Sequence, residues 1–251
     1  MKVLVAGATG VLGTEIVRRL RGRGHEVRAL VRSTSAPEKT ARLRGPGVTI
    51  VEGDLKDPAS LAAACGGVNA VISGAGTMSL IDAALAVGAR HFVFVSFDTS
   101  VVPKCPLTAA KREAEDHLKR SGLTYSILHP SLLMESWLGP MVFADLAAGT
   151  AKVYGEGNAM IRYVAVSNVA DLAVLCLTTP AAIGRGSGRE VLRGPLARRG
   201  AWSRLGHPAA VRELPDEDGD GEVLRPTPST RSPNANVEIR PPTWRGERHS
   251  G

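Results

Sequence analysis

Three glycines near the start of the chain, Gly7, Gly10 and Gly13, have the spacing of a turn that holds the phosphates of a dinucleotide. Gly7 permits the tight turn, Gly10 leaves space for a pyrophosphate against the backbone, and Gly13 lets the next helix lie close to the preceding strand. The phosphates would meet free backbone N–H groups at the positive end of the helix dipole. The spacing therefore predicts a dinucleotide-binding site.

Arg32 stands directly after a second predicted strand, Glu26–Val31. In dinucleotide-binding folds this point meets the adenosine ribose, where an acidic residue favours the free 2′-hydroxyl and an arginine favours a 2′-phosphate. A guanidinium can bind a phosphate through two parallel hydrogen bonds. Arg32 therefore predicts NADP as the cofactor, with NADPH preferred over NADH. An exposed arginine in a basic loop is the alternative interpretation.

Asp54 and Leu55 follow the third predicted strand, Val48–Val51. The carboxyl end of a strand in an open α/β sheet is where ligands bind. A carboxylate beside an apolar residue suits the amino group and ring of an adenine. An aspartate in a turn also commonly accepts a hydrogen bond from its own backbone. The sequence leaves both interpretations of Asp54 open.

Small and hydroxyl-bearing residues end the next two predicted strands. Ser73 and Gly74 close the strand Ala70–Ser73, where small residues let the backbone approach a ligand. Ser96 ends the strand His91–Ser96. We therefore expect the Ser96 hydroxyl at the same ligand-binding edge of the sheet.

Strands and helices alternate along the first two thirds of the chain. This alternation predicts an α/β fold with a Rossmann-like, doubly wound parallel sheet and right-handed crossovers. The predicted strands are Lys2–Ala6, Glu26–Val31, Val48–Val51, Ala70–Ser73, His91–Ser96 and Thr124–Leu128. The predicted helices are Leu12–Leu20, Pro58–Ala64, Ser79–Val87, Thr108–Ser121 and Val169–Leu177.

Composition limits the classes of partner. The net charge is +7, but the basic residues are spread over helix faces and the last part of the chain, and aromatic residues make up only 4%. We therefore expect no nucleic-acid partner. The sequence has no apolar run of membrane-spanning length, which predicts no membrane association. The three cysteines are far apart and lack metal-ligand spacing, which predicts reduced thiols, no metal site and a cytoplasmic location.

In combination, these motifs resemble the NmrA-like branch of the atypical short-chain dehydrogenase/reductase superfamily, over about the first 195 residues. The resemblance rests on Gly7–Gly13, Val31-Arg32, Gly53-Asp54-Leu55, Phe94-Val95-Ser96, Lys111 with Glu115, Ser121–Tyr125, His129-Pro130-Ser131, Met134-Glu135, Gly155-Glu156-Gly157, Val166–Ala173 and Gly194-Pro195. It implies a Rossmann-like domain that binds NADP and a small substrate portion after it.

The resemblance also assigns roles to individual residues. It implies that the pyrophosphate lies on Gly7, Thr9, Gly10, Val11, Leu12 and Gly13, the 2′-phosphate on Arg32, and the adenine at Asp54 and Leu55. It implies that Ser73 and Gly74 lie along the cofactor, Lys111 near the nicotinamide ribose, and His129, Pro130 and Ser131 beside the nicotinamide. Lys111 is assigned by the resemblance alone, because a lysine within a basic helix is usually solvated.

The sequence departs from the superfamily at one catalytic position. Catalytic members have a tyrosine four residues before the lysine, and its phenol acts as the general acid or base. Leu107 stands there and cannot transfer a proton. Tyr125, within the sixth predicted strand, is expected in the core. The candidate catalytic residues are Lys111, which the resemblance implies, and Ser96, with water as a further source of the proton.

We expect an NAD(P)-binding domain over residues 1–194, with a small, incomplete substrate portion at about 130–165. The apolar run from Trp137 to Ala148 would line a pocket for an apolar substrate, or simply pack on the sheet. Residues 195–251 contain eight of the 16 prolines and show neither helical nor strand periodicity. We expect this tail to be disordered.

Two functions stay open. The first is an NADPH-dependent oxidoreductase that reduces a small carbonyl, quinone or enone substrate, as a monomer or homodimer. The second is a non-catalytic NADP(H)-binding regulator that senses redox state and docks to a protein partner, which Leu107 favours. A sugar-nucleotide epimerase or dehydratase is a weaker third, because that chemistry needs the missing tyrosine.

Overall fold

Apolar, largely β-branched residues form the central strands, which are buried on both faces as in parallel sheets. The computed structural model describes residues 1–75, 78–98, 105–138, 144–145, 150–154, 162–179, 189–191 and 234–238. The chain divides into two units. The first contains residues 1–133 and 162–212, and the second contains residues 134–161 and 213–251.

The first unit contains a seven-stranded sheet in the order β3-β2-β1-β4-β5-β6-β11, in which every pairing is parallel. Its strands are β1 (Lys2–Ala6), β2 (Glu26–Val31), β3 (Val48–Glu52), β4 (Ala70–Ser73), β5 (His91–Val95), β6 (Tyr125–Leu128) and β11 (Arg189–Val191). The strand order reverses between β1 and β4, which is the point where doubly wound sheets bind nucleotides. The predicted doubly wound sheet is therefore confirmed, and β11 extends it at one edge.

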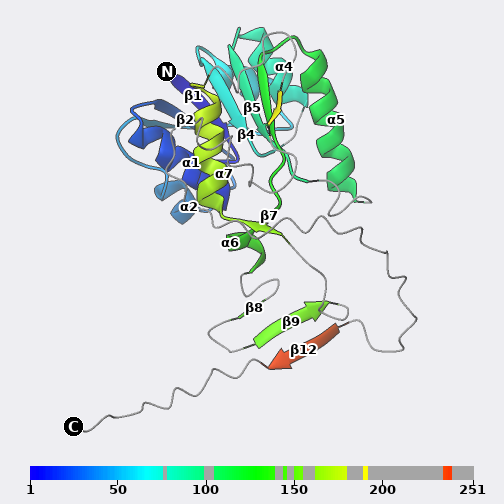
Figure 1. Ribbon diagram of the computed structural model, residues 1–251. Helices are drawn as coiled ribbons and strands as arrows, with labels where there is room; N and C mark the ends of the chain where they lie inside the picture. Colours follow the sequence, from blue (N-terminus) through cyan, green and yellow to red (C-terminus); the bar gives the residue numbers. More distant parts are fainter. Residues whose placement is uncertain are drawn as a thin grey trace, which may run out of the picture. The chain divides into compact units, whose positions relative to one another are not determined.

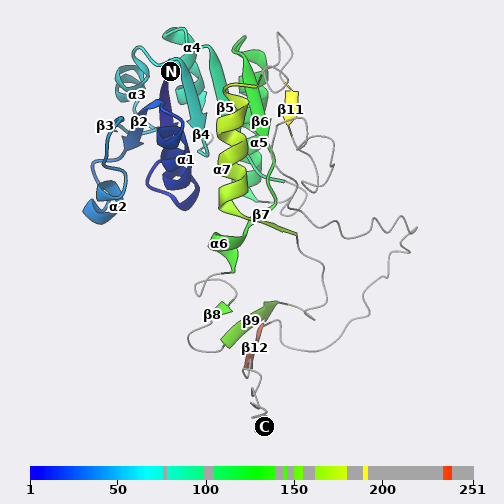
Figure 2. The ribbon, with the colours of Figure 1, turned by 60° about the vertical axis from the view of Figure 1, so that its left-hand side comes forward.

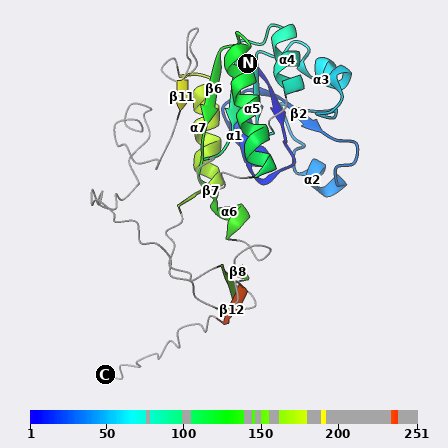
Figure 3. The ribbon, with the colours of Figure 1, turned by 90° about the vertical axis from the view of Figure 1, so that its right-hand side faces the viewer.

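Helices cover both faces of the sheet (Figure 1). One face carries α1 (Val11–Gly22) and α7 (Val166–Cys176), which lie side by side in Figure 2. The other face carries α3 (Pro58–Cys65), α4 (Met78–Ala86) and α5 (Pro106–Arg120), seen together in Figure 3. Each face has its own apolar core. Because all the pairings are parallel, the carboxyl ends of the strands lie together at one edge of the sheet.

Ion pairs join α1 to α7 on the first face. Asp171 lies 3.3 Å from the guanidinium of Arg19 and 3.4 Å from that of Arg23. Arg19 also lies 3.1 Å from the carboxylate of Glu15 on its own helix. Because the Asp171 side chain is only 16% exposed, these pairs are screened less than surface pairs.

Short elements complete the described chain. In the first unit, α2 (Pro37–Ala41) follows β2, and β7 (Leu132–Leu133) pairs in parallel with β10 (Tyr163–Val164). In the second unit, α6 spans Met134–Trp137, and β9 (Thr150–Tyr154) pairs antiparallel with β8 (Ala144–Asp145) and with β12 (Asn234–Glu238). Five residues of the tail expected to be disordered thus form a strand, and the rest of 195–251 apart from them lies outside the described residues.

The predicted helices all occur, with shifted ends. α5 begins at Pro106 instead of Thr108, because a proline has the backbone angle of a first helical position and needs no N–H partner there. Asp57 caps α3, accepting a hydrogen bond of 3.0 Å from the backbone N–H of Ala59. None of the helices within the described residues has the length and apolar character needed to cross a membrane.

Candidate cofactor and active site

The turn between β1 and α1 is built by the first two glycines of the motif. Gly7 has φ +77°, which favours glycine, and its carbonyl accepts a hydrogen bond of 3.0 Å from the N–H of Gly10. α1 begins at Val11, and its first turn contains no acidic side chain. The N–H groups at the start of a helix have no carbonyl partner within it. They are therefore placed to bind an anion.

Gly13 brings the helix against this turn. A Cβ at position 13 would lie 2.1 Å from the carbonyl oxygen of Gly7 and 2.8 Å from the Cα of Ala8. Both are backbone atoms and cannot rotate away. The expected close approach of helix and strand is confirmed, while contacts of Thr9, Val11 and Leu12 with a pyrophosphate stay predictions.

Arg32 directly follows β2 at the same edge of the sheet. Its side chain is exposed, and its backbone N–H donates a hydrogen bond of 3.2 Å to the hydroxyl of Ser35. Within the described residues its guanidinium has no hydrogen-bond or ion-pair partner. The guanidinium is therefore available to a phosphate.

The Asp54 carboxylate is engaged in its own turn. Its Oδ1 accepts a hydrogen bond of 2.9 Å from the N–H of Lys56, as the second interpretation of this residue expected. Leu55 is half-buried and packs against the core beside α3. Contact of either residue with an adenine stays a prediction.

Ser73 and Gly74 shape the end of β4. The Ser73 hydroxyl is buried, donates to the carbonyl of Ala75 at 2.6 Å and accepts from the N–H of Ala75 at 3.1 Å. This hydroxyl therefore closes a turn. Gly74 presents its carbonyl oxygen to the side chain of Lys111.

Lys111 on α5 is buried, with 6% of its surface exposed. Its ammonium donates hydrogen bonds to the carbonyls of Gly74 at 2.5 Å and Val95 at 2.9 Å, and lies 4.6 Å from the ring centroid of Phe94. Burial lowers the pKa of Lys111 to about 8, although the charge of Glu115 opposes the shift. This lysine joins the ends of β4 and β5 and can release a proton near neutral pH.

Glu115 lies one helical turn after Lys111 and binds two further polar residues of the site. Its Oε1 accepts hydrogen bonds from the Ser96 hydroxyl at 2.5 Å and from Nε2 of His129 at 3.0 Å. Burial opposes ionisation of Glu115, but the hydrogen bonds from His129 and Ser96 and the charges of His129 and Lys119 hold its pKa below the usual value. In the sequence, Glu115 belongs to the family motif with Lys111 but had no predicted role. Its i, i+4 spacing from Lys111, which places both side chains on one helix face, was the signal that could have identified it.

The residues after β6 and at the start of α5 complete the edge. Ser131 donates a hydrogen bond of 2.6 Å to the carbonyl of Arg162, and the Pro130 carbonyl accepts one of 2.9 Å from the N–H of Asp98. Leu107 is 57% exposed in the first turn of α5. Tyr125 lies in β6 against the core, as expected.

The second unit holds the start of the predicted pocket lining. Trp137 and Leu138 are exposed, at 37% and 41%. Residues 139–143 and 146–148 lie outside the described residues, so the expected apolar pocket is not tested.

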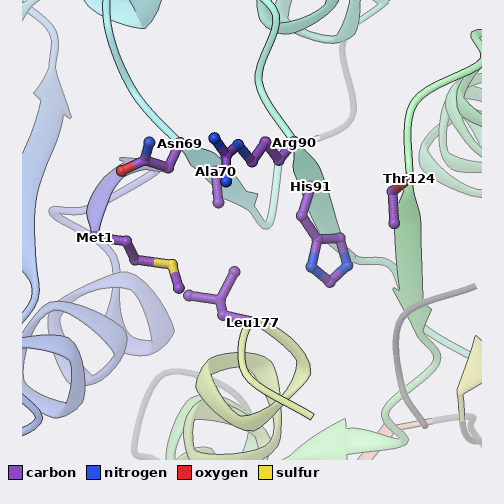
Figure 4. A pocket seen from close by; sticks show the side chains of 7 residues that line it. All are labelled: Met1, Asn69, Ala70, Arg90, His91, Thr124 and Leu177. Atoms are coloured by element: carbon purple, nitrogen blue, oxygen red, sulfur yellow. The ribbon is translucent and has the colours of Figure 1, made fainter. Parts of the chain in front are cut away.

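A cavity of about 390 Å³ lies at the opposite edge, where the strands begin. Figure 4 shows the imidazole of His91 in it, between the start of β5 and Leu177 beyond α7. Burial lowers the pKa of His91 to about 4. The other lining residues are Met1, Asn69, Ala70, Arg90 and Thr124. None of the predicted cofactor residues lines this cavity.

Comparison with known proteins gives both a family and a fold. A model of the NmrA-like family matches residues 1–157. Photosystem II assembly factor Ycf39 of Synechocystis sp. is 34% identical over 191 residues, which cover 69% of this chain but only 57% of that protein. NAD(P)H azoreductase of Xenophilus azovorans is 30% identical over 212 residues, covering 79% of this chain and 70% of that enzyme. The solved structure of AtPrR2 with NADP+ and (+)-pinoresinol matches with a TM-score of 0.57 at 23% identity, covering 72% of this chain and 67% of that one.

Proposed function

The chain belongs to the NmrA-like family of NAD(P)-binding Rossmann proteins, and on that basis we propose that it is an NADPH-dependent reductase of a small carbonyl, quinone or enone compound. The observation that carries this proposal is the buried Lys111, whose ammonium is held at the ends of β4 and β5 by two backbone carbonyls. A buried cation with a pKa of about 8 is suited to proton transfer.

The residues present fit a dinucleotide. The turn from Gly7 to Gly10 leaves the N–H groups at the start of α1 without helical partners, and no acidic side chain in the first turn competes with a phosphate there. A Cβ at Gly10 would lie 3.3 Å from the Gly7 carbonyl, so a side chain would fill this cradle. Arg32 would bind the 2′-phosphate and thereby select NADPH.

The chemistry divides between the cofactor and the chain. Bound NADPH supplies the hydride at the nicotinamide C4. Lys111 would orient the nicotinamide ribose, and His129, Pro130 and Ser131 would lie beside the ring. Lys111, Ser96 or a water molecule would give a proton to the oxygen of the reduced substrate, since Leu107 stands where catalytic members of the superfamily have a tyrosine.

The decisive experiment uses the full-length chain with NADPH and three probes: menadione, an aromatic aldehyde and an α,β-unsaturated ketone. We expect NADPH oxidation with at least one probe. Lys111→Met should lower kcat at least about tenfold, since general acid–base groups contribute about 100-fold or more. The control Lys2→Met removes a lysine that pairs with Glu26 at the opposite edge, 3.6 Å away, and should leave kcat unchanged. Turnover no faster than the uncatalysed reaction with all three probes would refute the proposal.

A second function is favoured by Leu107, which carries no dissociable proton at the position where catalytic members of the short-chain dehydrogenase superfamily have a tyrosine. The chain would then bind NADP(H) and report its redox state to a protein partner. Calorimetric binding of NADPH without turnover, together with partners whose capture differs between NADP and NADPH, would support this function over the reductase.

A further inference from the structure

Resting on the proposed reductase function, we propose that Glu115 is a positioning residue that aligns Ser96 and His129 into one hydrogen-bonded relay. In this relay, Ser96 protonates the reduced substrate and His129 restores the proton to Ser96. The two partners approach the same carboxylate oxygen, at 2.5 Å from the Ser96 hydroxyl oxygen and 3.0 Å from Nε2 of His129. Such a relay would supply the proton that catalytic members of the superfamily take from a tyrosine, at the position where this chain has Leu107.

Three different elements hold the relay in place. Ser96 follows β5, Glu115 lies on α5, and His129 follows β6. The backbone N–H of Ser96 donates a hydrogen bond of 2.8 Å to the carbonyl of Leu128, which continues the pairing of the two strands. The positions of Ser96 and His129 are therefore fixed by the sheet, and α5 brings the carboxylate between them.

Burial makes the hydrogen bonds obligatory. Ser96, Glu115 and His129 are exposed by only 5%, 6% and 9%. A buried carboxylate must be paired and hydrogen-bonded, or its desolvation cost is not compensated. A carboxylate can only accept hydrogen bonds, so both the Ser96 hydroxyl and Nε2 of His129 must donate. Lys119, 3.9 Å away, and the nearby Lys111 add positive charge on the same helix.

In the proposed relay, one proton moves from His129 through Glu115 and Ser96 to the substrate. Hydride addition to the substrate carbon moves the C=O electron pair onto oxygen. The Ser96 hydroxyl then rotates its single hydrogen away from Glu115 and gives it to that oxygen. In the proposed relay, Oε1 of the Glu115 carboxylate first takes a proton from Nε2 of His129 in its imidazolium form and then passes it to the Ser96 oxygen. The net change is one proton from the imidazolium to the substrate oxygen. His129 regains its proton from water after product release.

The test compares Glu115→Gln with Glu113→Gln in the full-length chain. Glu113 is exposed on the same helix, so its variant controls for loss of a carboxylate from α5. The assay measures kcat and KM with the probe that the wild type reduces, the calorimetric Kd for NADPH, and the solvent deuterium isotope effect on kcat. Glu115→Gln should lower kcat about 10- to 100-fold and increase the isotope effect, with KM and Kd within about twofold of the wild-type values. Glu113→Gln should match the wild type in all four.

A second variant guards against misfolding. Ser96→Ala interrupts the relay at its substrate end and keeps the pair between Glu115 and His129, so it should reproduce the loss of kcat even if Glu115→Gln does not fold. Equal losses of NADPH affinity and kcat in the folded variants would show a purely structural role and overturn the relay. Unchanged kcat in an active enzyme would overturn the relay alone, whereas an inactive wild type would refute the reductase function and the relay with it.

Discussion

Replacing Gly13 with alanine tests whether the close contact between α1 and the glycine turn holds the cofactor site together. The added Cβ would lie 2.1 Å from the Gly7 carbonyl oxygen and 2.8 Å from both the Gly7 carbonyl carbon and the Ala8 Cα. Cβ atoms essentially never approach other heavy atoms within 3.0 Å. The helix must therefore move away from the turn by about an ångström, because the obstructing atoms are all backbone.

The cost follows from that displacement. Overpacking a close-packed site costs about 1–3 kcal/mol, and contacts this short belong at the upper end of that range. A loss of about 3 kcal/mol would lower the urea midpoint by about 1.5 M, for a denaturant slope of about 2 kcal/mol per molar. The same movement withdraws the first N–H groups of α1 from the position of the pyrophosphate, so NADPH affinity should fall as well.

Urea unfolding and calorimetric titration with NADPH measure the two effects. Gly22→Ala is the matched control, because it lies on the same helix and a Cβ there would meet nothing within 4 Å. Alanine is the better helix former by up to about 1 kcal/mol, so this control should be neutral or slightly stabilising. If Gly13→Ala unfolded at the same urea concentration as Gly22→Ala, the close contact would not have the energetic role inferred for it.

Three further predictions concern charge. Arg32→Ala should weaken NADPH binding by about 10- to 100-fold and leave NADH nearly unchanged, whereas the exposed Arg42→Ala should affect neither, as calorimetry would show. Asp171→Asn should cost about 1 kcal/mol in urea unfolding at low salt and less at about 1 M salt, while Asp116→Asn on the exposed face of α5 should cost little. Burial lowers the pKa of His91 from about 6.5 to about 4, so as the pH is lowered the unfolded chain takes up this proton at a higher pH than the folded chain does. The free energy of unfolding should therefore fall by about 2 kcal/mol from about pH 7 to pH 5. His91→Gln should flatten this pH dependence, and an unchanged slope would show that His91 does not cause it.

The glycine turn, where we propose that the cofactor binds, could be predicted from sequence because backbone atoms form it. The spacing of Gly7, Gly10 and Gly13 is a local constraint, and the structure shows the positive φ and the close helix that this spacing predicts. The position of Arg32 at this edge of the sheet follows from the fact that it comes directly after β2. In a parallel sheet, knowing where each strand ends is enough to know which residues share an edge.

The arrangement that we propose for proton transfer could not be predicted in the same way, because its side chains come from elements far apart in sequence. The basic neighbours of Lys111 made it resemble a solvated residue, yet α5 packs with this lysine facing the sheet. The bonds of Glu115 to Ser96 and His129 depend on how α5 lies across β5 and β6. The sequence spacing shows that Glu115 shares a helix face with Lys111, but it cannot show which side chains of other elements bind Glu115. Asp54 is the opposite case: its carboxylate accepts a hydrogen bond from Lys56, two residues away in sequence, and such a local bond was one of the two predicted interpretations.

The position of Lys111 would let one lysine hold the strand ends together and also take the catalytic role that we propose for it. An ammonium has three N–H donors, and within the described residues two of them bind the carbonyls of Gly74 and Val95. The third would then be the donor for a ribose hydroxyl or a substrate oxygen, so the strand ends stay joined while the ligand is held. If Lys111 releases its proton, it still has two N–H donors for the two carbonyls. Proton transfer at this residue is therefore compatible with an unchanged sheet edge.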